Sequence, residues 1–192
     1  DEIVYEGAFG YADRENGIVA DADTVYEWGS ISKTLVWVSV MQLWERGEID
    51  LEKDIREYLP ENFLRKLKYD DPITMLNLMN HNAGWSENVW AFQTDDEEEI
   101  KSLGEILQET EPVQVYRPGE VSSYSNYGAA LAGYVVECIT EQPFHEYVHE
   151  NIFEPLGMEH TSLLPAHNDN EWVYAQRPKT VCYTNTGAGW VS

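Results

Sequence analysis

The most strongly apolar stretch of the chain runs from Ile31 to Trp44, and its pattern predicts a core helix. Hydrophobic residues fill positions 35–38, 40, 41 and 43, so almost every face of this helix is apolar. A helix of this kind belongs in the interior of a protein. Ser30 is the predicted N-cap, because its side-chain oxygen can accept from an unpaired N–H of the first turn. Gly47 marks the C-terminal end.

Elsewhere the pattern predicts one strand and several helices. A strand is expected over residues 2–13, a turn at 13–17 and a short extended piece at 24–28. Further helices are expected near 52–58, 73–80, 98–109, 125–140 and 143–153. Pro155 is expected to end the last of them. One strand and a short extended piece cannot make a stable sheet, so we expect either a very small sheet or a chain that is part of something larger.

Composition permits one sizeable core and argues against nucleic acid as a partner. Hydrophobic residues make up 43% of the chain. Its length of 192 residues is short for two independent domains. Asp and Glu number 35 against 12 Lys and Arg, giving a formal net charge of −23, which repels a phosphate backbone. The acidity fits a high-salt habitat or an ordinary acidic secreted protein. The acidic run at 95–99 is expected to be a solvated loop before a helix start.

Neither the apolar runs nor the cysteines of the chain decide its compartment. No apolar run is long enough to span a bilayer, so we expect no transmembrane segment in this chain. The two cysteines, Cys138 and Cys182, do not make a disulfide framework. Cys138 lies in an apolar helical pattern and is expected to be a buried free thiol.

Lys33 is out of place in the predicted core helix and calls for a chemical explanation. A capping box would have Glu or Gln three residues after Ser30. The helix dipole disfavours a cation in the first turn, and burial disfavours the charged amine further. Ser30 and Lys33 share one face of the turn, so a neutral lysine there can take the proton from the serine hydroxyl. The alternative is an N-cap serine followed by a lysine that extends to solvent.

A second polar group, Tyr124-Ser125-Asn126, stands at the start of another apolar helix, after a Pro-Gly turn. A tyrosine phenol can relay protons if nearby cations lower its pKa, and an asparagine amide can orient both a lysine and a substrate. The alternative is a loop tyrosine followed by an N-cap asparagine. The two motifs in this order favour a catalytic site.

These motifs and the stretches around them resemble the penicillin-recognising serine hydrolases. The relevant branch contains class C β-lactamases, D-alanyl-D-alanine carboxypeptidases, and related esterases and D-amino-acid peptidases. The matching stretches, in the family order from about Tyr5 to the C-terminus, are GSISKTL, GEIDLEKDIREYLP, ITMLNLMNHNAG, PGEVSSYSNYG and IFEPLGMEHTS. The resemblance implies an α/β (α+β) fold of the β-lactamase/transpeptidase-like type. The chain would hold mostly the helical domain, with one or two strands of the incomplete antiparallel sheet.

The resemblance also implies a role for each polar residue of the two motifs. Ser30 would be the nucleophile, Lys33 its base partner, Tyr124 a proton relay, and Asn126 a contact to substrate and lysine. His81 is then expected to be a hydrogen-bonding loop residue rather than a general base. The implied substrates are β-lactams or D-alanyl peptides, and the implied location is extracytoplasmic (periplasmic or secreted). An esterase, a D-amino-acid peptidase or a non-catalytic relative that binds cell-wall peptide are the alternatives.

The family's third motif, a Lys-Thr-Gly or His-x-Gly triplet on a sheet strand, has no match here. Lys179-Thr180-Val181 has a β-branched residue in place of the glycine, and the triplet at 160–162 belongs to another loop. The resemblance therefore implies an internal fragment, truncated at both ends relative to the family. We expect a partial sheet segment over 1–29 and the nucleophile helix with the helical domain over 30–192. The missing strands would be needed to complete the site.

A competing motif is the literal HEYVH at His145 to His149, which is typical of zinc proteases. On a helix, the two imidazoles would share one face, with Glu146 as base and Glu171 as a distant candidate for a third ligand. The helix is short, its histidines flank an apolar stripe, and no third histidine follows at the usual spacing. We therefore expect no metal site and no cofactor.

Overall fold

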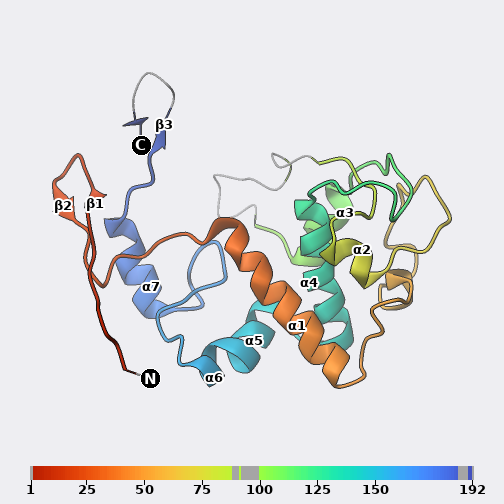
Figure 1. Ribbon diagram of the computed structural model, residues 1–192, viewed down its shortest axis with the longest axis horizontal. Coiled ribbons are helices and arrows are strands. Elements are labelled where there is room, and N and C mark those ends of the chain that lie inside the picture. Colours follow the sequence, from red (N-terminus) through yellow and green to blue (C-terminus); the bar gives the residue numbers. More distant parts are fainter. Residues whose placement is uncertain (1, 88–90, 92–99, 186–189, 192) are drawn as a thin grey trace. The chain divides into compact units, whose positions relative to one another are not determined.

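The structure is a computed structural model that describes residues 2–87, 91, 100–185 and 190–191. The chain divides into two compact units (Figure 1). One unit is Ser30–Gly157, and the other joins Asp1–Gly29 to Met158–Ser192. The expected division into 1–29 and 30–192 refers to the domains of the family and stays a prediction.

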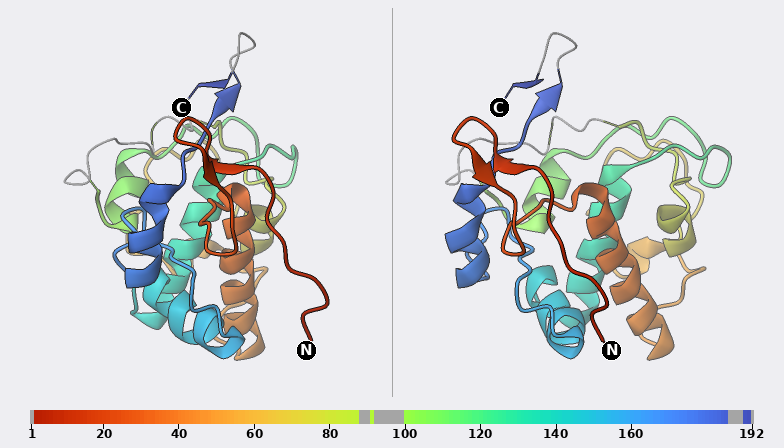
Figure 2. Two further views of the ribbon diagram at one scale, coloured as in Figure 1. Left: turned by 90° about the vertical axis from the view of Figure 1, so that its left-hand side faces the viewer. Right: turned by 60° about the vertical axis from the view of Figure 1, so that its left-hand side comes forward.

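The unit Ser30–Gly157 is helical, with α4 at its centre. Its elements are the 3-10 turn η1 (Gly29–Ser32), α1 (Lys33–Glu45), the 3-10 turn η2 (Ile55–Glu57), α2 (Met75–Met79), α3 (Leu103–Glu109), α4 (Asn126–Thr140), α5 (Phe144–Val148), the π-helical turn η5 (His149–Phe153) and α6 (Glu154–Leu156). Helix α4 contacts α1, α2, α3 and α5, and its ribbon runs beside that of α1 (Figure 2). It is the helix expected over 125–140, which is confirmed.

Helix α1 is only partly buried, so the prediction of a helix buried on almost every face is wrong. Its buried residues are Leu35, Val36, Ser39, Val40 and Leu43. Val38, Met41 and Trp44 lie on the other side and are 44%, 36% and 51% exposed. An apolar pattern reports the type of side chain, so it cannot tell which side of an all-apolar helix is covered.

The prediction that Ser30 caps α1 is also wrong. The α-helix begins at Lys33, and its N-cap is Ser32, whose side chain makes no capping hydrogen bond. The cause is the tight 3-10 turn η1, which begins at Gly29 in a left-handed conformation (φ +53°) and contains Ser30. This turn replaces the first α-helical turn that the pattern predicts.

Two of the other predicted elements are found in shorter form. Only Tyr11–Asp13 of the strand expected over 2–13 is a strand, and the helix expected over 52–58 is reduced to η2. Residues 95–99, with the acidic run and the expected start of the next helix, lie outside the described residues. No helix in the part of the chain that the structure describes has the length and apolar character of a membrane span.

Pro155 does not end a helix, contrary to the prediction. It lies in the first turn of α6, directly after the π-helical turn η5, so the chain accommodates it without leaving the helical path. The helical path continues through η5 into α6 and ends at Gly157, which has a left-handed φ of +65°. The glycine, and not the proline, is therefore the stop signal.

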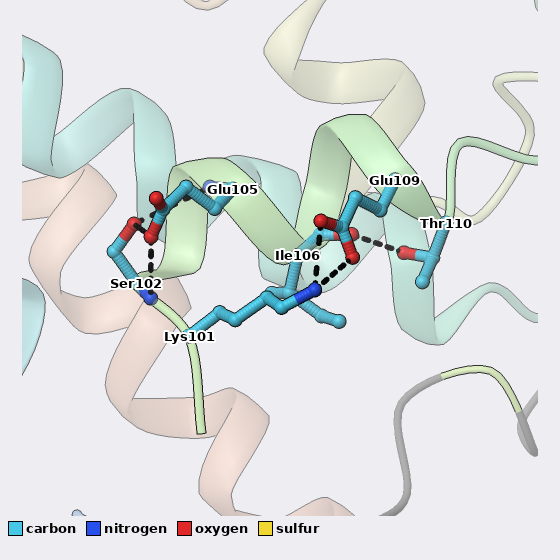
Figure 3. A network of polar contacts seen from close by, with 6 residues as sticks. All are labelled: Lys101, Ser102, Glu105, Ile106, Glu109 and Thr110. Carbon is cyan, nitrogen blue, oxygen red and sulfur yellow. Dashed lines mark hydrogen bonds and ion pairs between the residues drawn. The ribbon is translucent and has the colours of Figure 1, made fainter. Parts of the chain in front are cut away.

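Local polar contacts set the start of α3 (Figure 3). The Ser102 hydroxyl accepts from the Glu105 N–H at 3.4 Å, and the Glu105 carboxylate accepts from the Ser102 N–H at 3.1 Å. This reciprocal pair is a capping box. Lys101 Nζ donates to both carboxylate oxygens of Glu109, at 2.8 and 2.6 Å. The buried Leu107 packs the helix into the core shared with α4.

Two buried polar side chains hold a loop that has no regular structure. Glu111 is 3% exposed, and its carboxylate accepts from the backbone N–H groups of residues 65 and 66 at 2.8–2.9 Å. Gln114 is fully buried and accepts from the N–H groups of residues 68 and 69 at 3.1 and 3.2 Å. Its amide also donates to the Ala83 carbonyl at 3.1 Å. These side chains supply the partners that buried backbone groups need.

Tyr127 at the start of α4 has a buried hydroxyl without a hydrogen-bond partner among the described residues. An unpaired buried polar group costs stability, whereas an apolar group of the same shape does not. We therefore expect Tyr127→Phe to leave the free energy of unfolding unchanged or to raise it by up to about 1 kcal/mol. Denaturant unfolding measures this change.

Tyr147 on α5 is the matched control for Tyr127→Phe. It is equally buried, but its hydroxyl accepts from Arg46 Nη2 at 2.6 Å and donates to Gln42 Oε1 at 3.0 Å. Tyr147→Phe is therefore expected to cost about 1–3 kcal/mol. If the two variants lose the same free energy of unfolding, the Tyr127 hydroxyl has a stabilising hydrogen-bond partner.

In its described residues, the second unit contains two short antiparallel strand pairs and one α-helix. Its elements are β1 (Tyr11–Asp13), β2 (Ile18–Val19), α7 (Glu171–Gln176), the 3-10 turn η6 (Arg177–Lys179), β3 (Thr184–Asn185) and β4 (Trp190–Val191). The expected turn at 13–17 is confirmed between β1 and β2. The Val181 N–H donates to the Ala12 carbonyl at 2.8 Å, and this bond joins the N-terminal and C-terminal segments of the unit.

Candidate active site

The start of α1 brings Ser30 and Lys33 together. Ser30 lies in η1, and Lys33 is the first residue of the α-helix. In a 3-10 turn, residues three apart lie above one another. The left-handed φ of Gly29 lets the chain enter this turn, because a residue with a β-carbon is strained there. Lys33 Nζ donates to Ser30 Oγ at 3.2 Å.

The start of α4 supplies the other two predicted residues. Ser125 is the N-cap, because its hydroxyl accepts from the Gly128 N–H at 2.9 Å, so the alternative of an N-cap asparagine is wrong. Asn126 is instead the first residue of α4, and its Oδ1 accepts from Lys33 Nζ at 2.7 Å. The Tyr124 hydroxyl donates to Ser30 Oγ at 2.8 Å.

Charge and burial act in opposite directions on Tyr124. Burial alone would raise the pKa of the Tyr124 phenol, but its contacts with Lys33 and Ser30 and the charge of Lys33 outweigh this effect and lower the pKa. The Lys33 ammonium also lies 4.9 Å from the centroid of the Tyr124 ring. A phenol with a lowered pKa exchanges a proton more readily near neutral pH, as a proton relay must.

His81 supports the loop that carries Tyr124. Its Nδ1 accepts from the Ser125 N–H at 3.2 Å, its carbonyl accepts from the Ser123 N–H at 2.7 Å, and its ring lies 4.5 Å from the Tyr124 ring. Burial and the neighbouring Lys33 cation lower the pKa of His81, which favours the neutral imidazole that can accept. The prediction of a hydrogen-bonding loop residue is confirmed.

Gly84 fixes the segment between His81 and the site residue Glu87. Its φ is +90°, and a β-carbon built there would lie 2.0 Å from the backbone oxygen of Tyr116. The Gly84 carbonyl accepts from the N–H groups of Val115 and Tyr116 at 2.8 and 3.1 Å. Only glycine allows the two backbone segments to approach this closely.

Glu87 is a site residue that the sequence did not reveal. Its carboxylate accepts from the backbone N–H of Asn126 at 2.9 Å and from Asn126 Nδ2 at 3.0 Å. Nothing in the sequence distinguishes it from the other acidic residues, because its partner lies 39 positions further along the chain. Only the folded chain brings the two together.

The arrangement combines a serine hydroxyl with two groups that can take up its proton. Ser30, Lys33, Tyr124 and Asn126 are joined by hydrogen bonds, although their catalytic roles stay a prediction. Ser30 and Tyr124 are exposed, whereas Lys33 and Asn126 are half-buried. A substrate carbonyl can therefore reach the hydroxyl while the amine is held by the protein. The chemistry that this geometry suits is acyl transfer.

The HEYVH motif is not assembled into a metal centre. His145 lies in α5 and His149 in η5, and His149 Nδ1 lies 3.3 Å from the Glu154 carboxylate. Among the described residues, no group of three or more His, Cys, Asp or Glu side chains is arranged to hold a metal ion. The candidate third ligand, Glu171, begins α7 in the second unit.

Comparisons with known proteins agree with one another. A family model described as Beta-lactamase matches residues 1–190. Penicillin-binding protein 4 of Amycolatopsis lactamdurans is 28% identical over 86% of this chain and 43% of its own length. The octameric penicillin-binding protein homologue from Pyrococcus abyssi has a TM-score of 0.78 at 24% identity, over 99% of this chain and 43% of that chain. D-amino acid amidase from Ochrobactrum anthropi SV3 has a TM-score of 0.64 at 27% identity, over 78% and 40%.

These similarities cover most of this chain but only part of each relative. The chain spans about two fifths of the length of the curated relatives that it matches. The solved structure at 24% identity is similar in fold. What these relatives bind or cleave is a property of the longer proteins.

Proposed function

Since this chain belongs to the Beta-lactamase family and has a β-lactamase/transpeptidase-like fold, we propose that it carries the acylating residues of a serine hydrolase. The observation that carries the proposal is the environment of the Ser30 hydroxyl. Lys33 Nζ lies 3.2 Å and the Tyr124 hydroxyl 2.8 Å from Ser30 Oγ. A serine is a weak nucleophile until a neighbouring group takes its proton, and here two such groups are within reach.

In the proposed reaction, Ser30 Oγ attacks the carbonyl carbon of an amide, an ester or a β-lactam. The proton acceptor in this step is the neutral form of the Lys33 amine or the phenolate form of Tyr124. It takes the hydroxyl proton and then gives it to the leaving nitrogen or oxygen as the bond to the carbonyl carbon breaks. Water then attacks the acyl-enzyme, releases the acid and restores the Ser30 hydroxyl. The Ser30 N–H is the proposed first donor to the oxyanion. A second donor, on a sheet strand outside these residues, is part of the same proposal.

The proposed substrates are β-lactams or peptides that end in D-alanine. The names of two relatives support this class, because one is a penicillin-binding protein and the other is a D-amino acid amidase. An extracytoplasmic location, periplasmic or secreted, belongs to the same proposal, since cell-wall peptides are found there. An esterase or D-amino-acid peptidase of the family and a non-catalytic relative that binds cell-wall peptide are the alternatives.

Covalent labelling tests the proposed nucleophile. A fluorescent penicillin is expected to label the full-length protein at Ser30. Ser30→Ala is expected to abolish the label because, among the residues that the structure describes, no other hydroxyl is held by both Lys33 and Tyr124. Gel fluorescence and peptide mapping measure the result. Ser32→Ala is the matched control, since Ser32 lies in the same 3-10 turn and should leave labelling unchanged.

The alternatives give different outcomes in the same experiment. Labelling by a fluorophosphonate but not by penicillin would favour the esterase. A wild-type protein that neither reagent labels would contradict the enzyme and favour a binding protein. Persistent label in Ser30→Ala would mean that the nucleophile is another residue.

A further inference from the structure

The carboxylate of Glu87 accepts two hydrogen bonds from Asn126. One oxygen, Oε2, accepts from the Asn126 backbone N–H at 2.9 Å, and the other, Oε1, accepts from Asn126 Nδ2 at 3.0 Å. The backbone N–H at the first position of a helix has no partner within the helix. A carboxylate at this end of α4 is also favoured by the helix dipole. One carboxylate therefore binds both the main chain and the side chain of Asn126.

The bond to Nδ2 decides which way the Asn126 carboxamide faces. On the opposite side of the amide, Oδ1 accepts from Lys33 Nζ at 2.7 Å. A half-turn of the amide would place its NH₂ group against the Lys33 amine and its oxygen against the Glu87 carboxylate. Both contacts would then pair like with like, donor with donor and acceptor with acceptor. Glu87 and Lys33 together thus allow only one orientation.

We propose that Glu87 is a positioning residue, which fixes the Asn126 carboxamide so that its oxygen holds the Lys33 amine against Ser30. The inference rests on the proposed function, because it concerns the acylation of Ser30. Glu87 touches neither Ser30 nor Lys33 through a hydrogen bond among the described residues, so it acts through Asn126. A loosened Asn126 lets the Lys33 amine move away from the hydroxyl, and small displacements of this kind slow acylation strongly.

The test is one substitution, Glu87→Gln, made in two backgrounds. Its effects on the acylation rate in the two backgrounds should have opposite signs. In the otherwise wild-type protein, Glu87→Gln replaces one acceptor oxygen by an NH₂ donor, so acylation should slow by about 10–100-fold. Asn126→Asp alone places two carboxylates against each other and should also be slow. Combined with Asn126→Asp, Glu87→Gln restores a donor-acceptor pair, because the new amide can donate to the new carboxylate. There it should speed acylation several-fold.

The measurement is the rate at which a fluorescent penicillin without an amino group acylates the full-length protein, together with thermal melts. Such a reagent excludes a direct contact between Glu87 and a substrate amine as the cause. Glu52→Gln is the matched control, since Glu52 is an exposed glutamate outside the site. It should leave the acylation rate unchanged both in the wild-type protein and in the Asn126→Asp variant. A residue that only caps α4 would shift the melting temperature by the same amount in both backgrounds, without a reversal of sign in the acylation rate.

The two proposals fail in different ways. If the wild-type protein is not labelled, the proposed function is wrong, and this inference is wrong with it. If the wild-type protein is labelled but Glu87→Gln slows acylation, or leaves it unchanged, in both backgrounds, only the positioning role of Glu87 is wrong.

Discussion

Replacing Lys33 by arginine is expected to slow the acylation of Ser30 by about 10²–10⁴-fold, the usual contribution of a general base. A guanidinium stays protonated under all assay conditions, so it cannot accept the Ser30 proton even where it keeps the contact to Asn126. Lys33→Ala should be nearly as slow, because neither variant has a base where Nζ now lies 3.2 Å from Ser30 Oγ. The measurement is the acylation rate of the full-length protein with a fluorescent penicillin.

Lys53→Arg is the matched control for the Lys33 variants, since Lys53 is an exposed lysine paired with Glu57 at 2.8 Å outside the site. Lys33→Met is expected to leave the melting temperature unchanged or to raise it, because stability is often given up for activity at such positions. If Lys33→Arg is acylated within a few-fold of the wild-type rate, Lys33 is only a structural cation and the proposed base is wrong.

Gly84→Ala is expected to lower the free energy of unfolding by about 2–6 kcal/mol. A φ of +90° costs a residue with a β-carbon about 1–3 kcal/mol. The β-carbon would also lie 2.0 Å from the Tyr116 carbonyl oxygen, and forcing apart two packed segments costs about 1–3 kcal/mol more. Denaturant unfolding measures the total, and each kcal/mol corresponds to about 2–4 °C in melting temperature. Because His81 and Glu87 flank this segment, acylation should slow as well.

Gly119→Ala separates the two contributions. Its φ of +87° is nearly the same as that of Gly84, but a β-carbon there would meet no atom within 4 Å. This variant should therefore show only the backbone strain, about 1–3 kcal/mol. If the two glycine variants lose equal stability, the close approach of Gly84 to Tyr116 contributes nothing.

The parts of the fold and of the site that depend on local order could be predicted from the sequence. Helix α4 has a continuous apolar face, and this signal lies within the helix itself. The spacing of three between Ser30 and Lys33 likewise places both on one side of any helical turn, whether it is 3-10 or α. The resemblance to a family then added Tyr124 and Asn126, which spacing alone could not have paired with Ser30.

The features that depend on tertiary contacts could not be predicted in this way. The exposed side of α1 carries the same types of apolar residue as its buried side, so only the packing against α4 distinguishes the two sides. Glu87 is one of 35 acidic residues, and its importance arises from a contact across 39 positions. The sequence pattern places the start of α1 too early, because a 3-10 turn that begins at a glycine with positive φ leaves no distinct signal in the pattern.

The division of the chain into a continuous and a discontinuous unit has a consequence for its biosynthesis. The unit that joins the first 29 residues to the segment after Gly157 is interrupted by the whole helical unit. The bond from Val181 to Ala12 can form only after all the intervening residues have been made, which takes on the order of ten seconds at about 5–20 residues per second. The segment before the helical unit, although synthesised before that unit, can therefore complete its contacts with the segment after Gly157 only once the helical unit has been made.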